Sequence, residues 1–184
     1  MSTNHTHDEI IAATKRWLEV AVIGLNLCPF AKAVHVKDQI RYVVSDAHDA
    51  EGVASDLVRE LETLAEANPE AIDTTLLIVS HGLDDFLDFN DFLDLADGIV
   101  EELELDGTLQ VAPFHPQFQF EDTEPDDITN YTNRSPFPIL HLLREDSVTR
   151  AVDAFPDEMH IAENNMQTLS KLEHAGWKAL FETK

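Results

Sequence analysis

The 184-residue chain has few basic residues, because 12 Lys and Arg stand against 36 Asp and Glu. The formal net charge is therefore −24 at pH 7. A field of this sign repels nucleic acid and anionic lipid headgroups, so we expect no nucleic-acid partner and no membrane-surface partner. The chain also lacks the apolar run of roughly 18 residues that a membrane span needs.

Cysteine is nearly absent as well, since Cys28 is the sole one. This excludes an internal disulfide and any multi-cysteine zinc or iron–sulfur site within one chain. No glycine-rich phosphate loop, Gly-x-Ser-x-Gly elbow or His-Glu-x-x-His helix occurs. Residues 1–9 lack the basic and apolar regions of a signal peptide, so we expect a cytoplasmic protein.

The apolar content of 43% is enough for a hydrophobic core, and the length suits one domain. We expect a flexible N-terminus over residues 1–7 and a single globular domain over 8–184. Helical spacing of apolar residues predicts helices over 8–25, 49–68, 84–105, 147–155 and 157–181. β-rich runs predict strands at 40–44, 74–79 and 108–112, and a strand or short helix at 139–143.

This alternation of strands and helices predicts an α/β (or α+β) single-domain sandwich. Its sheet is expected to be small and mostly parallel, with about four strands and helices packed around it. The carboxyl ends of parallel strands share one rim, where ligands bind. The loop at 113–116 leaves that rim and runs into the irregular stretch 117–138. Structureless loops longer than roughly 12–15 residues are often functional, so we place the candidate site there.

Arg134 is the main candidate in this loop. No Lys or Arg occurs between Arg59 and Arg134, in a stretch rich in Asp and Glu. With Asn130 and Asn133 beside it, Arg134 could bind a carboxylate or phosphate bidentately; alternatively, it pairs with an acidic neighbour and pins the loop. Arg144 is either a further substrate ligand or the partner of a structural carboxylate.

Histidines supply the candidate acid–base and metal-binding groups. His115 is a candidate general base, and the alternative is a packed loop histidine bonded to backbone. We predict no metal site; if one exists, its ligands are His81, His115 and Asp46. His141, within the apolar run 139–143, is interpreted as a hydrogen-bonded core histidine.

Cys28 is followed by Pro29, which is favoured at the first position of a helix. A thiol at such a helix N-terminus, with Lys32 nearby, is favoured as a thiolate. Cys28 is therefore a candidate nucleophile or pocket-wall residue, and Lys32 a candidate substrate ligand. The alternative is that Cys28 is a small, buried apolar residue.

Four motifs together carry a resemblance to a known family: GLNLCPFAK over 24–32, FHPQFQF over 114–120, TNRSP over 132–136 and LHLLRE over 140–145. In these segments the chain resembles an uncharacterised bacterial family, domain of unknown function 1415. The resemblance implies a similarity over nearly the whole chain. It implies no reaction and no cofactor, so the cofactor is unknown, but it draws attention to Cys28 and the Arg134 loop.

The leading hypothesis is an enzyme acting on a small anionic or polar metabolite in a pocket at the rim. Arg134 would anchor the anion, His115 would move protons, and Cys28 would be nucleophile or pocket wall. One alternative is a non-catalytic module that binds a small ligand or a protein. Another is a transition-metal-binding protein using His81 and His115. The substrate and the oligomeric state stay open.

Overall fold

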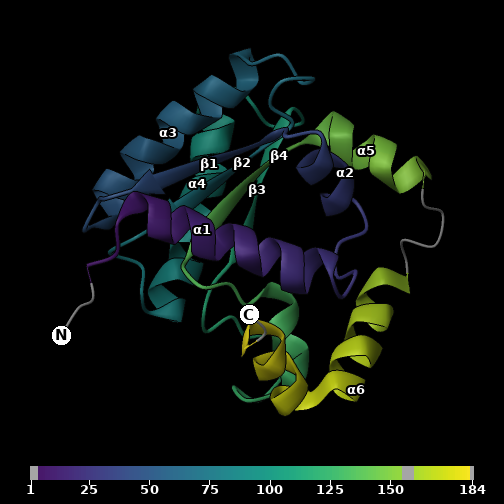
Figure 1. Cartoon of the computed structure of the whole chain (residues 1–184). Helices are drawn as coiled ribbons and strands as arrows, with labels where there is room; N and C mark the ends of the chain where they lie inside the picture. The colour runs from purple at the N-terminus through teal and green to yellow at the C-terminus, as the bar shows by residue number, and fades with distance from the viewer. Residues whose placement is uncertain (1–3, 155–159, 183–184) are drawn as a thin grey trace.

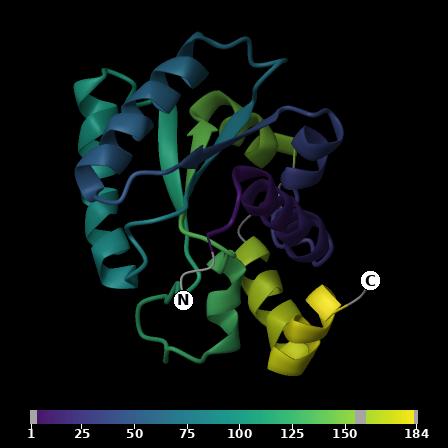
Figure 2. The same ribbon diagram turned by 60° about the vertical axis from the view of Figure 1, so that its left-hand side comes forward.

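The computed structural model describes residues 4–154 and 160–182. Its centre is a four-stranded sheet of β1 (Ile40–Ser45), β2 (Thr74–Val79), β3 (Leu109–Phe114) and β4 (Ile139–Arg144). Two long helices, α3 (Ala50–Glu66) and α4 (Phe86–Glu102), cover one face (Figures 1 and 2). The other face lies under α1 (His7–Trp17), the π-helical turn η1 (Leu18–Ile23), α2 (Ala31–Val36) and α5 (Glu145–Ala154). The 3-10 helix η2 (Ile128–Asn133) and α6 (Ile161–Glu182) pack together beyond one end of the sheet.

The strand order is β1-β2-β4-β3, with β1 parallel to β2 and β4 antiparallel to both of its neighbours. The strands predicted at 40–44, 74–79 and 108–112 are present, and the segment 139–143, predicted as a strand or a short helix, is a strand. The prediction of a mostly parallel sheet was wrong, because the sheet is mixed. The reason lies in the long loop after β3. It returns the chain to the rim where β3 ends, so that Ile139 pairs with Phe114 and β4 runs back in the opposite direction.

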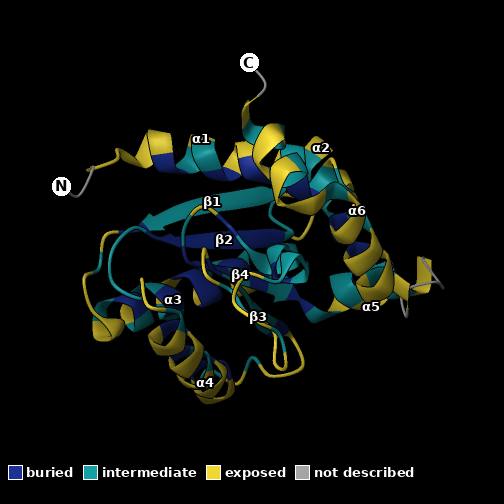
Figure 3. Ribbon diagram, turned by 90° about the horizontal axis from the view of Figure 1, so that it is seen from below, coloured by how far each residue is buried: buried dark blue, intermediate teal, exposed yellow. Residues whose placement is uncertain are grey.

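The central strands divide their side chains between two apolar clusters. Leu77 and Val79 join the cluster under α3 and α4, and Leu76 and Ile78 join the cluster under α1. Every residue of β2 is buried, as its continuous apolar run predicted (Figure 3). Burying each such aliphatic side chain contributes about 1.5–3 kcal/mol, so the sheet is a rigid floor for a site on either face.

The first predicted helix is not regular throughout. Thr6 caps α1 through a capping box with Glu9, which satisfies two of the backbone N–H groups at the helix start. After Trp17 the α-helix continues as the wider π-helical segment η1. Such π-helical turns are frequent at functional sites. Gly24 then closes the turn, where an added Cβ would lie 2.2 Å from the carbonyl oxygen of Val20. This close approach requires glycine, and it directs the chain toward Cys28.

The last helix also departs from the prediction of one continuous helix over 157–181. Glu173 has φ 58° and ψ 173°, which breaks α6 into two segments. A non-glycine residue at positive φ costs about 1–2 kcal/mol. The break turns Trp177 and Phe181 back toward η2, and the rings of Trp177 and Tyr131 lie 5.1 Å apart. The ends of the predicted helices at 155 and 157 lie outside the described residues.

Candidate functional site

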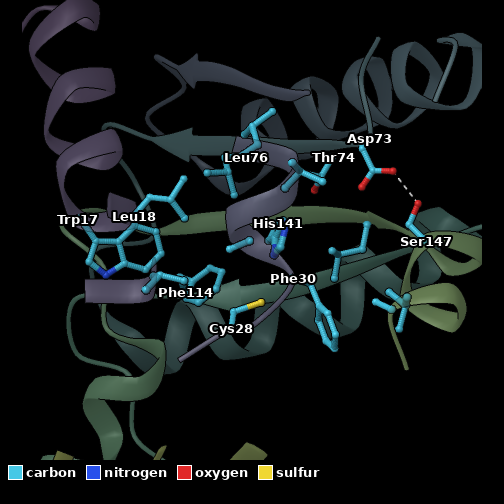
Figure 4. A pocket seen from close by; sticks show the side chains of 17 residues that line it. Trp17, Leu18, Cys28, Phe30, Asp73, Thr74, Leu76, Phe114, His141 and Ser147 are labelled. Atoms are coloured by element: carbon cyan, nitrogen blue, oxygen red, sulfur yellow. Dashed lines mark hydrogen bonds between the residues drawn. The ribbon is translucent and has the colours of Figure 1, made fainter. Parts of the chain in front are cut away.

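An apolar cavity of about 120 Å³ lies between the sheet and the helices α1, α2 and α5. We call it the Cys28 cavity (Figure 4). Its floor comes from the strands and its walls from η1, α2, α5 and the turn around Cys28. The side chains labelled at its centre are Trp17, Leu18, Cys28, Leu76, Phe114 and His141.

His141 supplies the imidazole of this cavity from the middle of β4. Its ring lies 5.7 Å from that of Phe114, and it has no hydrogen-bond partner within residues 4–154 and 160–182. Burial lowers the pKa of His141 to about 4, so the imidazole is neutral at pH 7. The interpretation as a hydrogen-bonded core histidine was therefore wrong. The ring faces a cavity, which one sequence does not reveal.

Cys28 lies on the opposite wall, half-buried, with its sulfur toward the cavity (Figure 4). Burial raises the pKa of the thiol, although hydrogen bonds from the backbone N–H groups of Phe30 and Ala31 partly offset that effect. This direction is opposite to the thiolate that we predicted. Helix α2 begins at Ala31 rather than Pro29 and spans six residues, so the expected helix N-terminus at Cys28 is missing.

The polar end of the Cys28 cavity is made by Asp73 and Ser147. The Ser147 hydroxyl donates a 2.6 Å hydrogen bond to the Asp73 carboxylate, which ties the start of β2 to α5 (Figure 4). Both residues also line an outer groove between α2 and α5, as do Phe30, Val34 and Ala151. The groove therefore adjoins the cavity at this end.

His115 lies elsewhere, fully buried against Phe89 of α4. Its Nε2 lies 2.9 Å from the carbonyl oxygen of Leu83, and its Nδ1 accepts a 3.0 Å hydrogen bond from the N–H of Gln117. Since a carbonyl only accepts, Nε2 carries the proton. Burial lowers the pKa of His115. This arrangement matches the alternative of a packed histidine bonded to backbone.

The asparagines of the long loop hold the loop itself together. The side-chain oxygen of Asn130 accepts from the N–H of Phe120 and from the Thr123 hydroxyl, and its NH2 group donates to the backbone carbonyl of Glu124. Asn133 donates to the carbonyl of Pro113 at the end of β3. Their roles as substrate ligands stay predictions, and the contacts show how they shape the loop around Arg134.

Arg134 forms no ion pair with the acidic residues near it in the sequence, within the described part of the chain. Its Nε donates to the carbonyl of Phe118 over 3.0 Å, its Nη2 donates to that of Pro125, and the guanidinium lies 4.6 Å from the Tyr131 ring centre. It lines a second cavity, of about 270 Å³, which we call the Arg134 cavity. This cavity shares Trp17 with the Cys28 cavity.

The other predicted basic ligands lie apart from both cavities. Arg144 donates to the carbonyls of Leu64, Ala67 and Ile72, so the expected pairing with a structural carboxylate was wrong. The last turn of α3 leaves carbonyls without helical partners, and these attract the guanidinium. Lys32 is exposed on α2.

The three residues named for a metal site have separate partners. Asp46 accepts a 2.8 Å hydrogen bond from His7, His81 stacks on His48 with ring centres 4.6 Å apart, and His115 is bonded as above. In the part of the chain that the structure describes, no three His, Cys, Asp or Glu side chains are grouped to hold a metal ion.

The leading hypothesis grouped Cys28, His115 and Arg134, although the sequence left open whether Cys28 and the Arg134 loop form one site; in the structure the three residues share no cavity. Cys28 and Arg134 line different cavities, and His115 lines neither. The sequence reasoning missed His141 and Trp17. A signal for His141 existed in the period of β4, which puts it on the face of Ile139 rather than that of Leu140 and Leu142.

The fold and cavities define a mixed α/β protein in which Cys28 and His141 share a cavity on the sheet face under α1, α2 and α5. A family model described as protein of unknown function (DUF1415) matches residues 9–179. The chain belongs to this family. No curated protein and no solved structure matches the chain. None of the described helices has the length and apolar character to cross a membrane.

Proposed function

We propose that the Cys28 cavity binds a small, uncharged, mostly apolar molecule that carries one hydrogen-bonding group. The observation that carries this proposal is the His141 imidazole, which faces the cavity without a partner among the described residues. His141 is partly buried, and a hydrogen bond from a ligand to its ring in this apolar cavity would contribute about 1 kcal/mol. A ligand hydroxyl or carbonyl would satisfy the ring.

The size and charge of the cavity define the ligand further. Its volume of about 120 Å³ is close to that of engineered cavities of about 150 Å³ that hold benzene. Among its described lining residues, Asp73 is the one charged group, and it is bonded to Ser147 at the cavity end. An anion would lose its hydration there without gaining a cation. A neutral ligand of about one aromatic ring fits best, entering from the groove between α2 and α5.

Phenol and toluene test this proposal, because they differ by the one group that His141 would bind. We expect phenol to bind at least about fivefold more tightly than toluene in calorimetric titrations, as one buried hydrogen bond contributes about 1 kcal/mol. His141→Leu should remove this preference. Val148→Phe, which fills the cavity from α5, should abolish binding of both compounds.

The matched control is Val36→Phe, the same change at an α2 position that is 73% exposed. It should leave phenol binding unchanged. Equal phenol affinity in the Val148→Phe and Val36→Phe variants would place the ligand outside the Cys28 cavity and end the proposal.

An enzyme that uses Cys28 on the bound molecule is the second candidate, favoured because the thiol and the His141 imidazole line the same cavity. A thiol becomes nucleophilic as the thiolate, so a base must accept its proton; with its pKa lowered to about 4, the His141 imidazole is too weak a base for this in the resting protein. In the resting protein the raised thiol pKa keeps Cys28 protonated. Any such activation would thus follow ligand binding.

The reactivity of Cys28 checks this electrostatic state. We expect N-ethylmaleimide to modify it at least about tenfold more slowly at pH 7 than it modifies a free small-molecule thiol, because burial disfavours the thiolate. Saturating phenol should slow the reaction further. A rate that matches the free thiol at pH 7 would contradict a protonated, buried sulfur. Mass spectrometry after timed quenching gives the rate, and urea-unfolded protein is the control.

A further inference from the structure

The Arg134 cavity suggests a second ligand. We propose that it is a binding site for a small carboxylate attached to an aromatic or flat apolar body. The cavity of about 270 Å³ lies where α1, η2 and α6 meet, and its main walls are Trp17, Tyr131, Arg134, Trp177 and Phe181. The proposal does not depend on the function proposed for the Cys28 cavity.

The positive charge of Arg134 favours an anionic ligand in the Arg134 cavity. Arg134 is the one charged residue among the described residues that line it, in a chain whose net charge is −24. No described carboxylate forms an ion pair with it. Elsewhere Arg41 pairs with Glu60 and Arg59 with Asp56. A cation kept from acidic partners in so acidic a protein is well suited to an external carboxylate.

The guanidinium is also held in a fixed plane. Its Nε and Nη2 donate to the carbonyls of Phe118 and Pro125, and its face lies on the Tyr131 ring. The Nη1 atom has no hydrogen-bond partner in the described part of the chain. Nη1 keeps both of its N–H groups and Nη2 keeps one, so a carboxylate can accept two parallel hydrogen bonds from these two nitrogens. A guanidinium that is already oriented loses little freedom on binding.

The aromatic side chains provide the surface for the body of the ligand. Trp177 lies edge-on to Tyr131 with ring centres 5.1 Å apart, and Phe181 lies 5.7 Å from Trp177. The break at Glu173 brings both residues to this position. Aromatic rings attract a further ring edge-to-face or offset-stacked. A benzoate-like molecule would place its ring among them and its carboxylate at Arg134.

Tryptophan fluorescence is a direct probe, since Trp17 and Trp177 are the only tryptophans in the chain and both line the cavity. We expect benzoate to change the emission in a saturable titration at low salt. Benzyl alcohol, which has the same ring without the charge, should bind at least about tenfold more weakly. Arg134→Lys should weaken benzoate binding at least about tenfold, because lysine lacks the planar fork.

The control for that variant is Arg59→Lys, the same change at an exposed arginine outside both cavities. It should bind benzoate as the wild type does. Because Arg134 also holds the loop, Trp177→Leu provides a second variant that keeps the arginine. It should weaken benzoate binding several-fold in calorimetry while the melting temperature shows a folded protein.

Three results would overturn the proposal: no saturable benzoate signal, equal affinities of the Arg134→Lys and Arg59→Lys variants, or equal affinities for benzyl alcohol and benzoate. The Val148→Phe variant distinguishes the two sites. It should retain benzoate binding while it loses phenol binding. Loss of benzoate binding in Val148→Phe would place benzoate in the Cys28 cavity and end this proposal alone.

Discussion

Replacing Arg144 by Met is expected to lower the free energy of unfolding by about 3 kcal/mol. Arg144 is 9% exposed, and its guanidinium donates to the carbonyls of Leu64, Ala67 and Ile72 over 2.8 to 3.1 Å. These carbonyls lie at the end of α3 and in the turn before β2, where the helix supplies no partner. Met keeps the length and apolar stem of Arg and leaves these oxygens unsatisfied, at about 1–3 kcal/mol for each group that water does not reach.

Urea unfolding followed by circular dichroism measures this effect. The matched control is Arg150→Met on α5, whose guanidinium is exposed and donates one 3.2 Å hydrogen bond to Ser147. It should change stability by no more than about 0.5 kcal/mol. If the two variants unfold at the same urea concentration, the carbonyl contacts of Arg144 contribute nothing to stability.

Acidification is expected to remove about 3 kcal/mol of stability through His141 alone. The pKa of His141 is lowered to about 4 in the folded protein, against about 6.5 in an unfolded chain. The unfolded state therefore binds the proton more readily than the folded state does. This loss begins as the pH falls below about 6.5 and is complete near pH 4. Above pH 6.5 the imidazole is neutral in both states and causes no pH dependence.

His141→Leu should flatten the pH dependence of the unfolding free energy between pH 6.5 and 4. Some slope should persist in His141→Leu because burial also lowers the pKa of His115. A slope in His141→Leu as steep as in the wild type would show that the folded protein accommodates the charged imidazole without a loss of stability.

The helices and strands could be predicted because their signals are local. The continuous apolar run of β2 and the helical spacing in α3 and α4 indicated elements close to those found. The place of β4 in the sheet could not be predicted from local sequence, because it depends on the rim to which the long loop returns the chain. No strand pattern tells whether the following strand joins an edge or inserts between two others.

The candidate site was predicted only in parts. Cys28 and Arg134 do line cavities, but the walls around them come from helices and strands far apart in the sequence. The partners of Arg134 are backbone carbonyls, which every residue carries and no sequence pattern marks. The free imidazole of His141 depends on a gap between packed layers, which follows from the shapes of many side chains together.

The central position of β4 has a consequence for the newly made chain. β1, α3 and β2 are synthesised in succession and can pair at once, but β3 contacts the sheet only through β4. β3 thus leaves the ribosome before the strand that it pairs with. Until Ile139–Arg144 has emerged, one apolar edge of β2 is unpaired and open to other chains. The last third of the polypeptide therefore decides whether the first two thirds complete a sheet or present an edge for aggregation.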